Sequence, residues 1–261
     1  MKSVVLSVAL ALGMAATTAV AEEASCKKVR FADVGWTDIQ VTTGTAQVIL
    51  EALGYEPEVK TLSVPVTYAS LKNKDLDVFL GNWMPSMTAD IKAYLEDKSV
   101  ETIGVNLENA GYGLVVPQYV ADAGVKSLAD LAANKDKFKG KIYGIEAGND
   151  GNRIISEMIA KKENKLDGFE LVESSEAGML TEAEKAMKNK EWIIFLGWTP
   201  HPIMGAMKIH YLDGMGDSGF GAATVATNVR AGYTKECPNV GKLLSNLKFN
   251  LEMEGAMMEP V

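Results

Sequence analysis

The sequence is poor in cysteine and histidine, and this scarcity excludes several kinds of site. It contains two cysteines and two histidines, His201 and His210, among 261 residues. Without a cysteine cluster or an HExxH motif they predict no metal site, and no other motif predicts a cofactor. No serine stands in a G-x-S-x-G context, so a hydrolase of that type is not indicated.

Basic residues are also in the minority. Lysine and arginine number 26 against 34 aspartate and glutamate residues, which gives a formal net charge of −8. Because a chain of this charge offers no basic face to neutralise phosphates, we expect no nucleic-acid partner. The hydrophobic content of 47% is that of an ordinary globular protein with ample core.

The first 21 residues have the features of a secretory signal peptide. Lys2 precedes an apolar run over residues 4–14, and Ala19 and Ala21 form an A-x-A cleavage pattern. The run is shorter than the ~20 apolar residues of a membrane span, and no later stretch approaches that length. We therefore expect an exported, soluble, periplasmic protein that begins at residue 22.

Export would place the two cysteines, Cys26 and Cys237, in an oxidising compartment. A disulfide between them is the economical prediction, because two free thiols would be a liability there. Two separately buried thiols are the alternative. A bridge would tie the mature N-terminus to a segment near the C-terminus.

Strand-like and helix-like segments alternate along the mature chain. Strands are expected over residues 28–33, 57–64, 76–81, a stretch ending at Pro117, 141–146, 169–173 and 191–198. Helices are expected over residues 37–55, 66–74, 150–163 and 177–190. This alternation with short connections predicts an α/β fold with parallel sheets flanked by helices.

Three of the four tryptophans stand at or just after the ends of predicted strands, in the strings GWTD (Trp36), GNWMP (Trp83) and LGWTP (Trp198). In open α/β sheets the ligand crevice lies beyond the carboxyl ends of the strands. Aromatic faces that converge there suit a quaternary ammonium ion, which is attracted to the face of the ring. Trp192 starts its strand and is assigned to packing, which is also the alternative role for each of the others.

Five strings together resemble those of the choline/glycine betaine substrate-binding proteins of ABC importers, the periplasmic choline-binding type in particular: ADVGWTDI, VFLGNWMPS, KIYGIEAGNDGNR, VESSEAGML and FLGWTPHP. The similarity runs from about residue 28 to residue 250. It implies a two-lobed type II periplasmic binding protein fold with the ligand cleft between the lobes. It also implies a monomeric, non-enzymatic receptor that delivers a quaternary amine to an ABC transporter permease in the inner membrane.

The resemblance further implies an aromatic box completed by an aspartate and an asparagine. Its members would be Trp36, Asp38, Trp83, Tyr112, Asn149 and Trp198, with Asn152 as the alternative to Asn149. The Asp38 carboxylate would offset the desolvation of a cation and accept the hydroxyl proton of choline. An alternative or additional role for Asp38, or for Thr37, is to cap the helix that follows.

Choline is therefore the expected ligand, and glycine betaine or another methylated amine is the alternative. A betaine carboxylate would need hydrogen-bond donors, for which Arg153 and His201 are the candidates in these motifs. An exported enzyme acting on such a cation would need both a nucleophile and a base beside the box, which Asp38 alone cannot supply. A ligand sensor that reports to a membrane receptor has no distinguishing motif.

The two lobes are expected to divide the chain into three parts. Residues 22–111 would begin lobe one, residues 112–204 would form lobe two, and residues 205–261 would return to lobe one. The crossings near Tyr112 and Met204 would form the hinge. Members of the family are expected to continue beyond the final string EMEGAMMEPV, so a truncated C-terminus is an open alternative.

Overall fold

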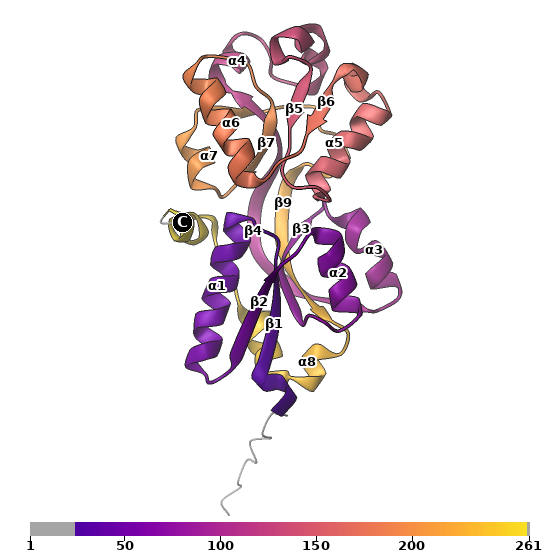
Figure 1. Ribbon diagram of the computed structural model, residues 1–261, viewed down its shortest axis with the longest axis vertical. Coiled ribbons are helices and arrows are strands. Elements are labelled where there is room, and N and C mark those ends of the chain that lie inside the picture. Colours follow the sequence, from indigo (N-terminus) through magenta and orange to yellow (C-terminus); the bar gives the residue numbers. More distant parts are fainter. Residues whose placement is uncertain (1–23, 260–261) are drawn as a thin grey trace, which may run out of the picture.

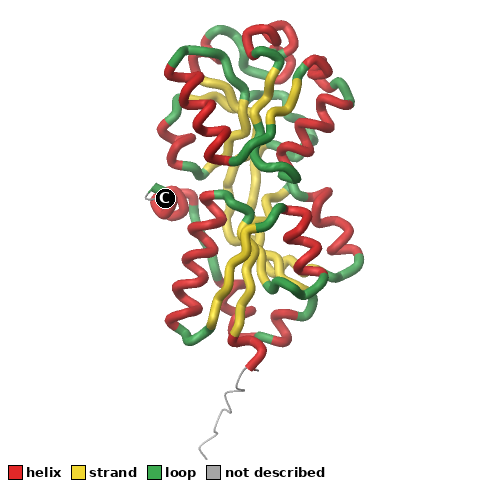
Figure 2. The backbone as a smooth tube through the Cα atoms, viewed as in Figure 1, coloured by secondary structure: helices red, strands yellow, loops and turns green. Residues whose placement is uncertain are grey.

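The structure is a computed structural model that describes residues 24–259. Two α/β lobes lie one above the other in Figure 1, and two long strands connect them (Figure 2). This arrangement confirms the predicted two-lobed α/β fold. The predicted signal peptide lies outside the described residues. Within residues 24–259, no helix is long and apolar enough to cross a membrane.

The described strands form one nine-stranded sheet that runs through both lobes. Its order is β2-β1-β3-β9-β4-β7-β5-β6, and β8 pairs with β4 at the side. The strands are β1 (Lys28–Asp33), β2 (Glu56–Thr61), β3 (Val78–Met84), β4 (Val100–Pro117), β5 (Lys141–Tyr143), β6 (Glu170–Val172), β7 (Phe195–Thr199), β8 (Ile209–Tyr211) and β9 (Gly221–Arg230).

Helices flank the sheet in each lobe (Figure 1). Lobe one, the lower one, carries α1 (Thr37–Ala52), α2 (Val64–Lys72), α3 (Thr88–Glu96), α8 (Tyr233–Glu236), α9 (Pro238–Asn246) and the 3-10 helix η1 (Ala24–Lys27). Lobe two carries α4 (Gln118–Asp122), α5 (Asp150–Ala160), α6 (Glu176–Lys188), α7 (Pro202–Ala206), η2 (Leu128–Asp130), η3 (Ala132–Phe138) and η4 (Glu163–Gly168). The last helix, α10 (Leu251–Met258), contacts both α1 and α7 and so lies where the lobes meet.

The strands β4 and β9 connect the lobes and run antiparallel to each other. β4 pairs with β9 from Val100 to Tyr112, and farther along it pairs with β7 from Gly111 to Val115. The pairs of β1 with β2 and β3, and of β5 with β6 and β7, are parallel as predicted. The prediction of parallel sheets is wrong for β4 and β9, because one carries the chain into lobe two and the other carries it back.

The position of β8 bears on where the chain returns to lobe one. Its residues pair with Val115–Pro117, in the part of β4 that belongs to lobe two. The next strand, β9, starts at Gly221 opposite Tyr112. We therefore propose that lobe two extends from about residue 112 to about residue 220, so that the return lies later in the chain than residue 205.

Close packing explains the glycines that precede two of the tryptophans. A Cβ atom on Gly81 of β3 would lie 2.8 Å from Cγ1 of Ile39 in α1. A Cβ atom on Gly197 of β7 would lie 2.7 Å from Cγ1 of Val115 in β4. Glycine in a strand commonly marks such a close approach. The LGNW and LGW strings therefore let a neighbouring element pack directly against the strand that carries the tryptophan.

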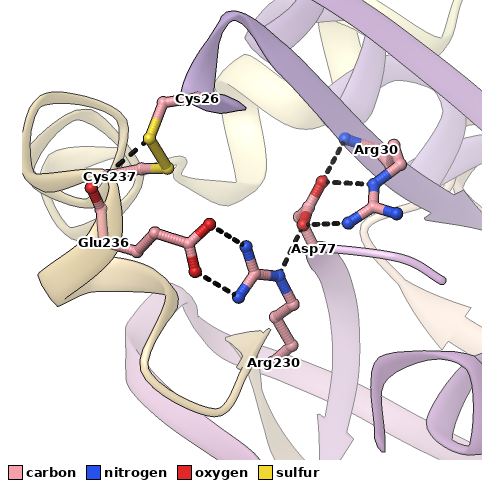
Figure 3. The surroundings of a disulfide bond; sticks show 6 residues. All are labelled: Cys26, Arg30, Asp77, Arg230, Glu236 and Cys237. Carbon is pink, nitrogen blue, oxygen red and sulfur yellow. Dashed lines mark hydrogen bonds and ion pairs between the residues drawn. A yellow bond between two sulfur atoms is a disulfide. The ribbon is translucent and has the colours of Figure 1, made fainter. Parts of the chain in front are cut away.

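A disulfide joins Cys26 of η1 to Cys237, which directly precedes α9, in lobe one (Figure 3). This confirms the predicted pairing, and the two cysteines are 211 positions apart in the sequence. The bridge links the first described element of the chain to the segment that follows β9. Lobe one is therefore cross-linked between its early and late parts.

A buried ion network lies beside the disulfide (Figure 3). The Asp77 carboxylate accepts hydrogen bonds from Arg30 and Arg230, each at 2.7 Å to Oδ1, and Arg230 forms two further bonds to Glu236 at 2.8 Å. Burial alone raises the pKa of Asp77, but the hydrogen bonds from the two arginines outweigh burial and lower it overall. The network therefore joins β1, the residue that directly precedes β3, β9 and α8 around one ionised carboxylate.

Candidate ligand-binding site

A small pocket lies between the two lobes. Its walls lie close together, and the cavity between them measures about 20 Å³. Only a small ligand suits a pocket of this kind. The residues that line it are Trp36, Asp38, Trp83, Tyr112, Ile145, Asn149, Asp150 and Trp198.

Four aromatic rings form much of the wall. The side chains of Trp36, Trp83, Tyr112 and Trp198 are all buried. The ring centroid of Tyr112 lies 5.8 Å from that of Trp83 and 6.5 Å from that of Trp198. The structure thus brings the four predicted aromatic residues to one pocket. Trp192 lies elsewhere, packed against Phe138 as predicted.

The aromatic side chains reach the pocket from four different elements. Trp36 precedes α1 and follows Gly35, whose φ of +83° turns the chain after β1. Trp83 and Trp198 lie within β3 and β7, near the ends of these strands. Trp198 stands at the end of its strand as predicted, whereas Trp83 was predicted to follow its strand. Pairing with β9 and β4 extends both strands past their glycines. Tyr112 lies in β4, where the strand crosses between the lobes.

Asp38 lines the pocket and holds Trp83 in place. Its Oδ2 accepts a hydrogen bond from Nε1–H of Trp83 at 3.0 Å, and its side chain is buried. Burial, with repulsion from Glu176, raises the pKa of the Asp38 carboxyl. The predicted capping role is wrong: the cap position of α1 is Trp36, without a side-chain cap, and the Thr37 hydroxyl donates to Glu176.

Asn149, and not Asn152, lines the pocket. Its Oδ1 caps α5 by accepting the backbone N–H of Asn152 at 3.0 Å, and it also accepts the Tyr112 hydroxyl at 3.2 Å. The Asn152 side chain instead bonds to the backbone of Ile145 and Glu146. This placement supports the choice of Asn149, whose contact with a ligand stays a prediction.

The sequence analysis missed two lining residues, Ile145 and Asp150. Asp150 is the first residue of α5, and burial raises the pKa of its carboxyl to about 6. The string GNDGN did contain a signal, because the acidic residue directly follows the predicted asparagine. That both of these adjacent side chains line the pocket depends on the backbone of the turn, which the string does not show.

Hydrogen bonds between the lobes hold the pocket closed on one side. Nε1–H of Trp36 donates to Oε1 of Glu146 at 2.9 Å, and the backbone N–H of Thr37 donates to Glu176 at 3.0 Å. Burial raises the pKa of the Glu146 carboxyl to about 7. The tryptophan that lines the pocket therefore also fastens lobe one to lobe two.

Arg153 and His201, the candidates for binding a ligand carboxylate, do not line the pocket. Arg153 of lobe two donates to the backbone oxygen of Ser86 and to Oδ2 of Asp90, both at 2.8 Å and both in lobe one. Nε2 of His201 lies 3.1 Å from Oε1 of Glu176. Both side chains bond to other parts of the protein, so the expectation that they would bind a ligand carboxylate is wrong. Arg153 instead links lobe two to lobe one.

The chemistry of the pocket follows from this inventory. It offers aromatic faces, two carboxylates and one amide, and none of its lining residues is cationic. The described residues contain no group of three or more His, Cys, Asp or Glu side chains placed to hold a metal ion. Such a pocket suits a small organic cation with an apolar surface. A small enclosed site between two α/β lobes defines a substrate-binding protein of the transport type.

The chain belongs to the family described as the substrate-binding domain of ABC-type glycine betaine transport systems, which matches residues 27–261. It is 59% identical to a solved ABC-transporter choline-binding protein in complex with choline, with a TM-score of 0.88 over 91% of this chain and 83% of that one. Lactococcal OpuAC, closed on glycine betaine, is 27% identical with a TM-score of 0.79 over 89% of each chain. A Chromohalobacter salexigens protein named uncharacterized protein ORF1 is 60% identical over 137 residues, 52% of this chain and 87% of that protein.

Proposed function

We propose that the protein captures choline between its lobes and delivers it to the permease of an ABC importer. The observation that carries this proposal is the pocket itself, where Trp36, Trp83, Tyr112 and Trp198 surround a space that Asp38 also lines. Each aromatic face attracts a desolvated quaternary ammonium by ~2 kcal/mol or more. Several faces together support micromolar affinity, which corresponds to ~8 kcal/mol, after the losses on association.

Choline is favoured over glycine betaine because of charge. The pocket is lined by carboxylates and by no lysine or arginine, so the carboxylate of a betaine would find repulsion where it needs donors. The amide of Asn149 already bonds to Asp150 and Tyr112. The likeness to a choline-bound binding protein supports the same choice. Glycine betaine is the second candidate, supported by the family and by OpuAC.

The proposed role places the protein in the periplasm as a monomer without catalytic activity. The export signal predicted over residues 1–21 and the membership of a transport family support this location. The carboxylates of the pocket lie beside a cation whose C–N bonds offer them no easy chemistry, which supports binding without turnover. Recovery of unchanged choline after prolonged incubation tests this, and any product would identify an enzyme.

Isothermal titration of residues 22–261 with choline, glycine betaine and trimethylamine N-oxide tests the proposed function. We expect micromolar binding of choline, weaker binding of the other two, and a parallel change in tryptophan fluorescence. If the protein binds glycine betaine more tightly than choline, glycine betaine becomes the proposed ligand. If a sample that melts cooperatively by circular dichroism binds none of the three ligands, the proposal is refuted.

Choline affinity is expected to fall at least tenfold as the pH is lowered from 8 to about 5.5. Burial raises the pKa of Asp38, of Glu146 to about 7 and of Asp150 to about 6 in the free protein. A bound cation favours the ionised carboxylates, so binding releases protons and weakens as the pH falls through these values. Titration in buffers of different ionisation enthalpy measures the released protons. An affinity that is constant from pH 8 to 5.5 would contradict this coupling.

The same carboxylates predict how stability responds to pH. Because their folded pKa is raised above the unfolded value, their contribution to the stability of the free protein is present at low pH and is lost as the pH rises through the folded pKa. Choline should therefore raise the melting temperature more at pH 8 than at pH 5.5. Thermal scans with and without choline at the two pH values provide the measurement.

The bridge formed by Arg153 predicts faster release of ligand when it is removed. Arg153→Gln loses the charged bonds to Asp90 across the cleft, and bonds to charged groups contribute ~1.5–3 kcal/mol each. We expect the dissociation rate of choline to rise about tenfold in stopped-flow fluorescence. Lys161→Gln, which removes a charge from an exposed pair just beyond α5, is the matched control. Equal rates in the two variants would show that the bridge does not hold the lobes together.

A further inference from the structure

Asp150 has an unused oxygen at the pocket. Its Oδ1 accepts a hydrogen bond from Nδ2 of Asn149 at 3.2 Å. Its Oδ2 is buried and has no hydrogen-bond partner among residues 24–259. The whole side chain is only 1% exposed, and Asp150 is one of the residues that line the pocket. A buried acceptor without a partner is costly unless a ligand satisfies it.

We infer that Asp150 is a second counter-ion, supplied by lobe two, which makes the pocket select a ligand of net positive charge over a zwitterion. Asp38 supplies the first carboxylate from lobe one, so a bound cation would lie between two carboxylates from opposite lobes. The inference rests on the proposed function and adds to it a residue that distinguishes choline from glycine betaine.

The surroundings of Asp150 support an ionised carboxylate. It occupies the first position of the eleven-residue helix α5, where the helix dipole favours a negative charge. Burial and the nearby Asp90 raise its pKa, while the neighbouring Ser86 hydroxyl, which donates to the backbone oxygen of Trp83, and the charge of Arg153 lower it. Arg153 itself bonds to Asp90 and Glu157, so its guanidinium is already paired. A ligand cation is therefore the partner that would compensate the charge of Asp150.

A counter-ion acts on charge, whereas a hydrogen-bond acceptor acts on the ligand hydroxyl, and this difference can be measured. A carboxylate a few ångströms from a quaternary ammonium stabilises it whether or not the ligand carries a hydroxyl group. A zwitterion places its own carboxylate in the same small pocket and loses much of that gain. Removing the charge of Asp150 should therefore lower the affinity for every net cation and spare glycine betaine.

The test is titration of the wild type and of Asp150→Asn with choline, ethyltrimethylammonium and glycine betaine. The asparagine has nearly the same shape, and a circular-dichroism melt checks its folding. We expect choline and ethyltrimethylammonium to bind at least about tenfold more weakly to the variant, and glycine betaine to bind as well as or better than before. Glu182→Gln removes the same charge from α6 of the same lobe, outside the pocket and paired with Lys185, and should leave all three affinities unchanged.

The outcomes separate the inference from the proposed function. If the wild type binds none of the three ligands, the proposed function fails before Asp150 is tested. If it binds choline and Asp150→Asn keeps the ratio of choline to betaine affinity within threefold, the inference is overturned. A loss confined to choline also overturns it, because Asp150 would then serve the hydroxyl group. An equal loss in Glu182→Gln would overturn it as well, because the effect would then belong to the overall charge of lobe two.

Discussion

Replacing Trp83 with alanine is expected to weaken choline binding by at least about 30-fold. The substitution removes an aromatic face, which is worth ~2 kcal/mol or more when it meets a desolvated cation. It also removes the Nε1–H that bonds to Oδ2 of Asp38, so the buried carboxylate loses its partner. Isothermal titration with choline provides the measurement, and Trp198→Ala should show a loss of the same order.

Two variants make this prediction specific. Trp192→Ala removes a tryptophan that packs against Phe138 outside the pocket, and it should leave the affinity unchanged. Trp83→Phe keeps a ring but loses the hydrogen bond to Asp38, so its loss should lie between those of the wild type and Trp83→Ala. If Trp83→Ala binds choline with the affinity of the wild type, the aromatic residues of the pocket do not bind the ligand as proposed.

Replacing both Cys26 and Cys237 with serine is expected to lower the free energy of unfolding by about 5 kcal/mol. The bridge closes a loop between residues 211 positions apart, and a cross-link of that length removes much of the entropy of the unfolded chain. Guanidinium denaturation of the two proteins measures the difference. Choline affinity should persist in the variant, because the bridge lies in lobe one away from the lining residues of the pocket.

The disulfide prediction has its own controls. A thiol titration under denaturing conditions should find no free thiol in the wild type. Glu236→Gln, beside Cys237, weakens the bidentate pair with Arg230 without opening the loop and should cost less than the double substitution. A loss below about 1 kcal/mol in the double variant would show that the unfolded chain gains little freedom from opening the bridge.

Much of the site could be predicted from local signals. The strings around Trp36, Trp83 and Trp198 each place a tryptophan near the end of an apolar strand, and the structure brings all three to one pocket. The cysteine pair was predictable because two cysteines in a chain that is predicted to be exported leave one economical pairing. These features depend on the residues themselves and on a resemblance carried by several strings.

What could not be predicted depends on contacts between distant parts of the chain. The insertion of β9 between β3 and β4 has no local signature, and it makes the centre of the sheet antiparallel. Arg153 was assigned to a ligand because its partner Asp90 lies in the other lobe, 63 positions earlier in the chain, and the sequence does not show that the two residues are neighbours. Asp150 was missed because the backbone of the turn before α5, which the sequence does not show, decides which side chains face the pocket.

The insertion of β9 also has a consequence for when the strands can pair during synthesis. The chain emerges from its N-terminus, so β1, β2 and β3 appear long before the strand that pairs with β3 on its other side. Until β9 (Gly221–Arg230) has emerged, the edge of β3 lacks that partner, and the thiol of Cys26 lacks its own until Cys237 has emerged. Lobe two, which is continuous between the crossings, has all its strands by then. The second lobe in the sequence can therefore be the first to finish, and the first lobe waits for the end of the chain.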